Sequence, residues 1–217
     1  MSRTSSRKAA GPHTPSVTPV FPLILLETMR DMDRPEEVLE GENLAASMPR
    51  RLGLSDVVYL QIHKFREETK KKSLQSPATV EDLIRLVIRR PDADEIFEEA
   101  GRRVARRAWS EKSAAARRWL RLMPSGMRLR AAAKGARRLM AEMAGNAELE
   151  VVARPFLLRL RGSLTSSADP GGAACAFYTG VLAELMTQYT GRRHSAQHSV
   201  CEARRGDACE WTALVAG

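Results

Sequence analysis

The sequence predicts an α+β protein, in which a small antiparallel sheet of about four strands packs with helices and follows an α-helical region. Apolar residues recur with the helical period of about 3.6 over most of residues 54–144, and from residue 148 the period changes to 2, which is typical of half-buried strands. The chain has 217 residues, of which 43% are hydrophobic, enough for one ordinary core and an accessory segment. We therefore predict a disordered basic tail (1–19), a helical accessory or dimerisation region (20–91) and an α+β domain (92–217).

The helical region contains three predicted segments. Pro22 opens a short apolar helix over residues 23–26, and acidic, turn-forming residues follow to about residue 43. Ser55 is the expected cap of an amphipathic helix from Leu54 to about Thr69. Thr79 and Asp82 form a capping box for the next helix, which Pro91 ends, with Leu83, Ile84, Val87 and Ile88 buried. We expect a homodimer through this region, because it has few other ways to bury Leu83, Val87, Ile96 and Phe97.

Three further helices are predicted before the sheet. Asp92 caps a helix that runs to about Trp109, with acids at its start and arginines at its end, as the helix dipole favours. Residues 112–123 form the next helix, which a Pro-Ser-Gly sequence ends, and a longer helix covers residues 127–144. Gly145 and Asn146 stop it.

The sheet is predicted from alternating residues. A hairpin pairs residues 148–151 with residues 156–161, and residues 192–200 and 209–215 supply the third and fourth strands. Between the two pairs, an apolar helix from Ala173 to about Tyr189 carries Cys175 in its first turn, where we expect the helix dipole to lower the pKa of the thiol.

The charge is uneven along the chain. The net charge is +9 and the isoelectric point is near 10.0, and 13 basic residues with one acid lie between Arg102 and Arg138, whereas Glu27–Glu42 has seven acids and two bases. The basic run predicts either nucleic-acid binding, through a patch of Arg117, Arg118 and Arg121 beside Trp119, or a solvated face, or contact with Glu27–Glu42 of the same or a partner chain. No apolar run reaches the 18 residues that a membrane span needs, and we expect a cytoplasmic protein.

All three cysteines lie in the last 43 residues. Cys201 and Cys209 bracket a polar turn, His198 precedes the first of them by three residues, and Cys175 lies on the preceding helix. Three thiols and an imidazole are a suitable tetrahedral set for zinc. Three alternatives remain from the residues alone: buried free thiols that pack as small apolar residues, a disulfide between Cys201 and Cys209, and His194 as the fourth ligand.

The order Cys175, a helix with Gly180, His198-x-x-Cys201 and Gly206-x-x-Cys209-x-Trp211 resembles the vinyl-4-reductase domain, over about residues 94–217. That domain is the ligand-sensing module of aromatic-responsive bacterial regulators. The resemblance implies a zinc ion held by Cys175, His198, Cys201 and Cys209, with His198 in the place of the family's Glu. It also implies a pocket for an apolar or aromatic ligand between the sheet and the helices, whose candidate wall residues are Trp109, Trp119, Phe156, Phe177, Tyr178 and Trp211.

We therefore expect a zinc-containing sensor or adaptor module that acts in signalling or transcriptional regulation. Two alternatives are an accessory protein of tetrapyrrole or bacteriochlorophyll metabolism, which the family name suggests, and a basic nucleic-acid-binding regulator. No nucleophile with its base, no glycine-rich phosphate loop and no pair of carboxylates at a plausible site can be recognised. The sequence thus favours a binding protein over an enzyme.

Overall fold

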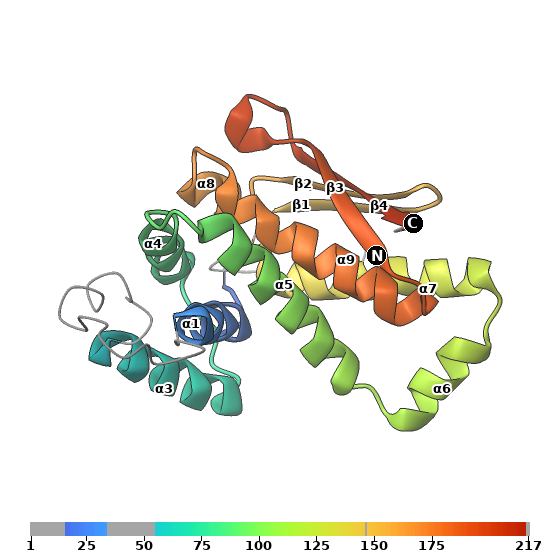
Figure 1. The fold of residues 1–217 in the computed structure, drawn as a ribbon, viewed down its shortest axis with the longest axis horizontal. Coiled ribbons are helices and arrows are strands. Elements are labelled where there is room, and N and C mark those ends of the chain that lie inside the picture. The colour runs from blue at the N-terminus through green and yellow to red at the C-terminus, as the bar shows by residue number, and fades with distance from the viewer. Residues whose placement is uncertain (1–15, 34–54, 146, 216–217) are drawn as a thin grey trace, which may run out of the picture.

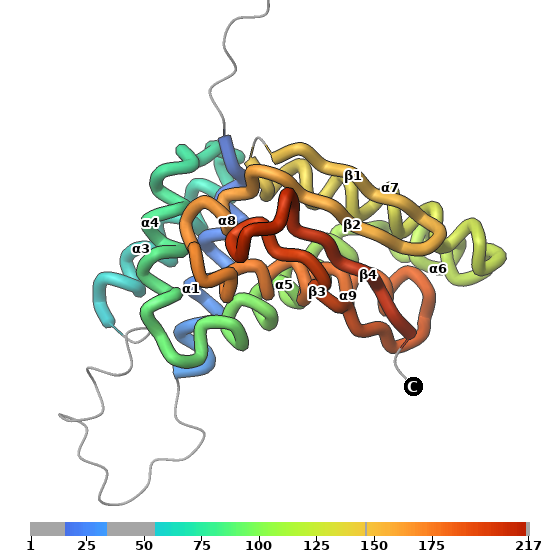
Figure 2. The backbone as a smooth tube through the Cα atoms, turned by 90° about the horizontal axis from the view of Figure 1, so that it is seen from above, coloured from blue at the N-terminus to red at the C-terminus, as the bar shows by residue number. Residues whose placement is uncertain are grey.

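The structure, a computed structural model, describes residues 16–33, 55–145 and 147–215. It has an α+β fold in which helices precede a four-stranded antiparallel sheet of order β1-β2-β4-β3. The long helices α5, α7 and α9 lie on one side of the sheet, and the short helix α8 lies near one end of its strands (Figure 1). In the view from above, β1 and β3 form the two edges (Figure 2).

The sheet follows the predicted alternation closely. Strands β1 (Glu148–Ala153) and β2 (Phe156–Arg161) pair as a hairpin, and β3 (His194–Val200) pairs with β4 (Cys209–Val215). The inward positions of β2 and β4 are buried, among them Leu158, Leu160 and Trp211. Helix α7 (Ser125–Met143) packs on β1. Helix α9 (Ala176–Thr190), which follows the 3₁₀ turn η3 (Ala173–Cys175), packs on β3 and β4. A short helix that we did not predict, α8 (Leu164–Ala168), lies between β2 and η3.

The crossing of α9 with α5 (Ala93–Ser110) is unusually close. A Cβ atom added to Gly101 of α5 would clash with the Phe177 carbonyl, and one added to Gly180 of α9 would clash with the Glu98 carbonyl. The two backbones therefore touch at this point, which only glycine permits on both helices.

The helices before α5 join the rest of the fold through α1 (Val20–Met32) and α4 (Pro77–Val87). Helix α1 lies between α3 (Asp56–Lys71) and α5, and α4 packs against α8. One buried apolar cluster runs from Val17 to Trp211, so the core crosses the domain boundary that we predicted at residues 91 and 92.

Several local predictions were wrong. The tail was expected to reach residue 19, but Val17 is buried and exchanges backbone hydrogen bonds with Gln75. The short helix over residues 23–26 is a 13-residue helix, because nearly all of its faces meet other helices. Ser76, and not a capping box of Thr79 and Asp82, caps α4. The remaining residues of the predicted tail and the acidic stretch 34–43 lie outside the described residues.

The reason for expecting a homodimer is also removed. Val87, Ile96 and Phe97 are fully buried inside the single chain, and Leu83 is partly buried against the same core. The homodimer itself stays a prediction.

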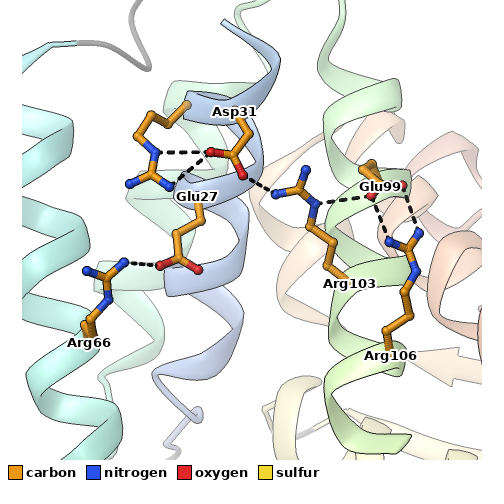
Figure 3. Close-up of polar contacts among 7 residues, drawn as sticks. Glu27, Asp31, Arg66, Glu99, Arg103 and Arg106 are labelled. Carbon is orange, nitrogen blue, oxygen red and sulfur yellow. Dashed lines mark hydrogen bonds and ion pairs between the residues drawn. The ribbon is translucent and has the colours of Figure 1, made fainter. Parts of the chain in front are cut away.

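Ion pairs cross the interface between α1 and its two neighbours. Glu27 and Asp31 of α1 pair with Arg66 of α3 and Arg103 of α5, and Arg103 also bonds Glu99 (Figure 3). This partly confirms the predicted contact of the acidic segment with arginines, although none of these arginines lies between Arg117 and Arg138.

Candidate metal centre

Four side chains that can bind a metal ion converge where the start of α9 meets β3 and β4. They are Cys175, at the N-cap position of α9, His198 on β3, Cys201 directly after β3, and Cys209, the first residue of β4. Their ligand atoms all lie within 4.8 Å of one another. Residues from three separate segments thus form one compact donor set.

The turn between Cys201 and Cys209 is fixed by its backbone. The amides of Arg204 and Gly206 both donate to the Cys201 carbonyl, at 3.1 and 2.9 Å, and the Glu202 amide donates to Cys209 Sγ at 3.3 Å. The Glu202 carboxylate accepts from the Gly162 amide and the Ser166 hydroxyl, which ties the turn to the start of α8. These hydrogen bonds therefore hold the two thiols close together without the help of an ion.

The imidazole of His198 is held by stacking. Its ring lies 4.4 Å from the Trp211 ring at an interplanar angle of 9°, and the Trp211 indole donates to Thr179 at 3.0 Å. His198 Nε2 is buried and has no hydrogen-bond partner among the described residues. A buried polar atom without a partner is costly, so this nitrogen is a natural metal donor.

His194 does not belong to the cluster. Its Nδ1 lies 2.8 Å from the Arg192 carbonyl and 3.3 Å from the Thr190 hydroxyl, near the other end of β3. The structure thus selects His198 from the two histidines that the sequence left open.

The three cysteines are free thiols, so the disulfide alternative is wrong for this structure. Cys175 Sγ and Cys209 Sγ are 3.8 Å apart. The hydrogen bond from Cys175 lowers the pKa of the Cys209 thiol, and contacts with His198 and the Glu202 amide add to this effect. The same bond and burial raise the pKa of the Cys175 thiol, contrary to our expectation from the helix dipole.

The six aromatic residues proposed as pocket walls do not share one cavity. Phe156, Phe177, Tyr178 and Trp211 are buried in the core, where Tyr178 touches both Phe177 and Trp211 edge to face. Trp119 is 62% exposed. Trp109 lines a cavity of about 300 Å³ between α5, α7 and α9.

The sequence interpretation missed most residues around that cavity, including Lys112, Gly135 and Tyr189. They come from segments far apart in the chain, and no spacing within one segment marks them.

The three arginines of the proposed nucleic-acid patch lie on α6 (Ala114–Leu122). Together with Trp109 and Ala114, Arg117, Arg118 and Arg121 line a shallow hollow of about 270 Å³. Within the part of the chain that the structure describes, none of the three has a carboxylate partner. Their charge is therefore directed to the solvent.

Fold and site together define an α+β protein with a candidate metal centre of three cysteines and one histidine. Comparisons of this chain with protein families, with curated proteins and with solved structures find no match. None of the described helices is both long enough and apolar enough to cross a membrane.

Proposed function

We propose that the cluster of Cys175, His198, Cys201 and Cys209 holds one zinc ion as a structural centre of a small-molecule-binding sensor or adaptor module. The observation that carries the zinc assignment is the convergence of all four ligand atoms within 4.8 Å, including the buried and unpartnered Nε2 of His198.

The donor set fits zinc in type and in spacing. A tetrahedral ion with metal–sulfur bonds of about 2.3 Å has sulfur–sulfur edges of about 3.8 Å. The distance from Cys175 Sγ to Cys209 Sγ is also 3.8 Å. Thiolates and neutral imidazole are the ligands that zinc prefers, whereas calcium and magnesium prefer oxygen.

A site with four protein ligands leaves no coordination position for a water molecule. Closed sites of this kind are structural, whereas catalytic zinc sites keep one position open. The ion would join the start of α9 to β3 and β4, and so would fix the helix against the edge of the sheet that β3 forms. This supports a binding module rather than a metal-dependent hydrolase.

The role as a sensor or adaptor in signalling or transcriptional regulation rests on the resemblance of the ligand spacing to the vinyl-4-reductase domain. The cavity beside Trp109 supports it, because its volume is at the lower end of the range for small-molecule sites, about 300 to 1,000 Å³.

Metal analysis tests the zinc centre. Protein purified without added metal should contain about one equivalent of zinc per chain, and Cys209→Ser should lose it. A chelator should lower the free energy of unfolding of the wild type by several kcal/mol, since an ion present at 1,000 times its Kd stabilises by about 4 kcal/mol.

Two histidines on one strand provide a matched control. His198→Ala should weaken zinc binding by roughly ten-fold or more, whereas His194→Ala should leave it unchanged because His194 lies outside the cluster. Equal zinc contents in the two histidine variants, or a metal-free wild type with Cys201 and Cys209 oxidised together, would refute the proposed centre.

A second candidate function, nucleic-acid binding, is favoured by one observation. Arg117, Arg118 and Arg121 have no carboxylate partners among the described residues, and Trp119 beside them is 62% exposed. Cations next to an aromatic ring suit phosphates and unstacked bases.

A further inference from the structure

The cavity between α5, α7 and α9 is separate from the metal centre. Its aromatic wall includes Tyr189, which follows Cys175 by 14 residues on the same helical segment, or about 21 Å along the axis. The core aromatics near the metal centre, Tyr178 and Trp211, fill their own space and do not line this cavity. A ligand here would not touch the zinc ligands.

The inner wall of the cavity is apolar and aromatic. Val104, Leu139, Met143 and Leu185 are buried apolar residues, and the rings of Trp109 and Tyr189 lie 5.0 Å apart at 60°. A Cβ atom on Gly135 of α7 would clash with the Tyr189 hydroxyl, so the glycine allows the tyrosine to lie against α7. Rings at this angle form a corner that a flat ring system can occupy.

Of the three cations that line the cavity, two are paired with carboxylates. Glu111 is paired with Arg107 at 3.3 Å, and Glu142 is paired with Arg138 at 3.4 Å. Lys112 has no carboxylate partner among the described residues, and its Nζ lies 5.6 Å from the centre of the Tyr189 ring. The ammonium group is thus available beside an aromatic wall.

The hydrogen-bonding groups of the two rings are also donors without partners. Neither the Trp109 indole nor the Tyr189 hydroxyl bonds any residue that the structure describes. This wall favours a negatively charged ligand with hydrogen-bond acceptors. A ligand without acceptors would exclude water from these donors and leave them without partners, which costs free energy.

We propose that this cavity binds a small planar aromatic acid of one ring or two fused rings, with its ring system against Trp109 and Tyr189 and its carboxylate on Lys112. This inference rests on the proposed function as a small-molecule-binding module, and it specifies the site and the ligand class. The cavity of about 300 Å³ suits a ligand of this size better than a larger one such as a tetrapyrrole.

Calorimetry with a charged and a neutral probe of the same shape tests the proposal. Wild-type protein should bind 2-naphthoate at least ten-fold more tightly than 2-naphthamide, because only the acid forms a charge-assisted bond with Lys112. Lys112→Met should remove this ten-fold preference by weakening the naphthoate complex, and should leave naphthamide binding nearly unchanged.

Lys134→Met is the matched control, because Lys134 is an exposed lysine of α7 that does not line the cavity. It should keep the wild-type preference. Ala108→Phe places a ring inside the cavity and should abolish binding of both probes. The preference between the probes in the wild type, and its decrease with added salt, supports the proposal even where a variant fails to fold.

Zinc content is measured on every sample, so that failure of this proposal is distinguished from failure of the metal centre. Zinc-loaded wild type that binds neither probe at millimolar concentration would overturn the cavity assignment. Equal affinities for the two probes, or equal effects of Lys112→Met and Lys134→Met, would overturn the assignment of an acid as ligand.

Discussion

The arginines of α5 are paired with carboxylates, whereas those of α6 are not. Arg102, Arg103, Arg106 and Arg107 each bond an acid on α1, α5 or α9 or at the C-terminal end of α5. Figure 3 shows this arrangement for Arg103 and Arg106. Only a few residues later, Arg117, Arg118 and Arg121 have no such partner among the described residues.

The difference teaches that a run of basic residues in a sequence is not one electrostatic feature. The arginines of α5 form ion pairs within α5 and with α1 and α9, whereas those of α6 leave a cationic surface. The net charge of +9 therefore says less about a binding partner than the positions of the cations that have no acidic partner.

The largest expected effect comes from a buried ion pair outside α5 and α6, between Arg90 and Asp33, which follow α4 and α1. The side chains of Arg90 and Asp33 are only 13% and 5% exposed, and two bonds of 2.7 and 2.8 Å join them. Arg90→Met should lower the free energy of unfolding by about 3 kcal/mol, because Asp33 loses its bidentate partner inside the protein.

Urea denaturation of the zinc-loaded protein measures this change. Arg85→Met is the control, since Arg85 also bonds two carboxylates but is 48% exposed, and its loss should cost less than about 1 kcal/mol. Similar losses of unfolding free energy in the two variants would show that burial does not make the ion pair of Arg90 stronger than those of Arg85.

A smaller effect should appear in the pH dependence of stability. Hydrogen bonding to Arg90 lowers the pKa of Asp92. For Asp31, burial acts to raise the pKa, but the bonds from Arg103 and Arg30 outweigh it and the pKa is lowered. Carboxylates with a lowered folded-state pKa stabilise the fold above their unfolded pKa of about 3.9, and this contribution is lost as the pH falls through the folded pKa.

Asp92→Asn should therefore reduce stability at pH 7 and show a shallower loss between about pH 5 and pH 3. Because acid would also protonate the thiolates and release a metal bound there, the measured quantity is the difference between wild type and variant at each pH. Asp82→Asn, at a carboxylate that is 76% exposed, provides the comparison. A constant difference between wild type and Asp92→Asn from pH 7 to pH 3 would contradict the assigned pKa shift.

The smallest effect on stability is expected on α6. Reversal of Arg117, Arg118 and Arg121 to Glu should change the free energy of unfolding by less than about 0.5 kcal/mol per site, because these side chains contact no described acid. A large loss of stability would show that they meet an acidic segment after all.

The same triple variant tests the nucleic-acid candidate. If α6 binds DNA, the wild type should bind duplex DNA with a log–log salt slope of about −0.9 per phosphate contact, and the triple variant should lose this binding. Reversal of Lys70, Lys71 and Lys72 on α3 makes the same change in net charge at another site. Equal losses in both variants, or no salt-dependent binding by the wild type, would remove the candidate.

Much of the fold could be predicted because local signals agreed with tertiary packing. The strand over residues 209–215 and the cap at Ser55 were predicted at the observed positions, since alternation and cap chemistry act within a few residues. The length of α1 was missed because its acids, such as Glu27 and Asp31, indicate an exposed turn until their arginine partners on other helices are known.

The candidate site also has a part that the sequence predicts and a part that it does not. The convergence of the four candidate ligands was predicted, because His198, Cys201 and Cys209 lie within 12 residues and Cys175, the remaining cysteine, lies on the preceding helix. The sequence could not show that the pKa values of the two thiols shift in opposite directions, since the contact of Cys175 with Cys209 exists only in the folded chain. The cavity with Lys112 was missed because it depends on the crossing of three helices.

The glycine contacts between α5 and α9 limit how this molecule can change shape. At Gly101 and Gly180 the close contacts are with backbone: a Cβ atom at Gly101 would meet the Phe177 carbonyl and the Val181 nitrogen. A shift of either helix along the other would therefore drive a side chain into backbone. The glycine contact therefore fixes the register of the two helices close to the start of α9, which carries Cys175. The rings of Trp109 and Tyr189 meet further along the same pair of helices.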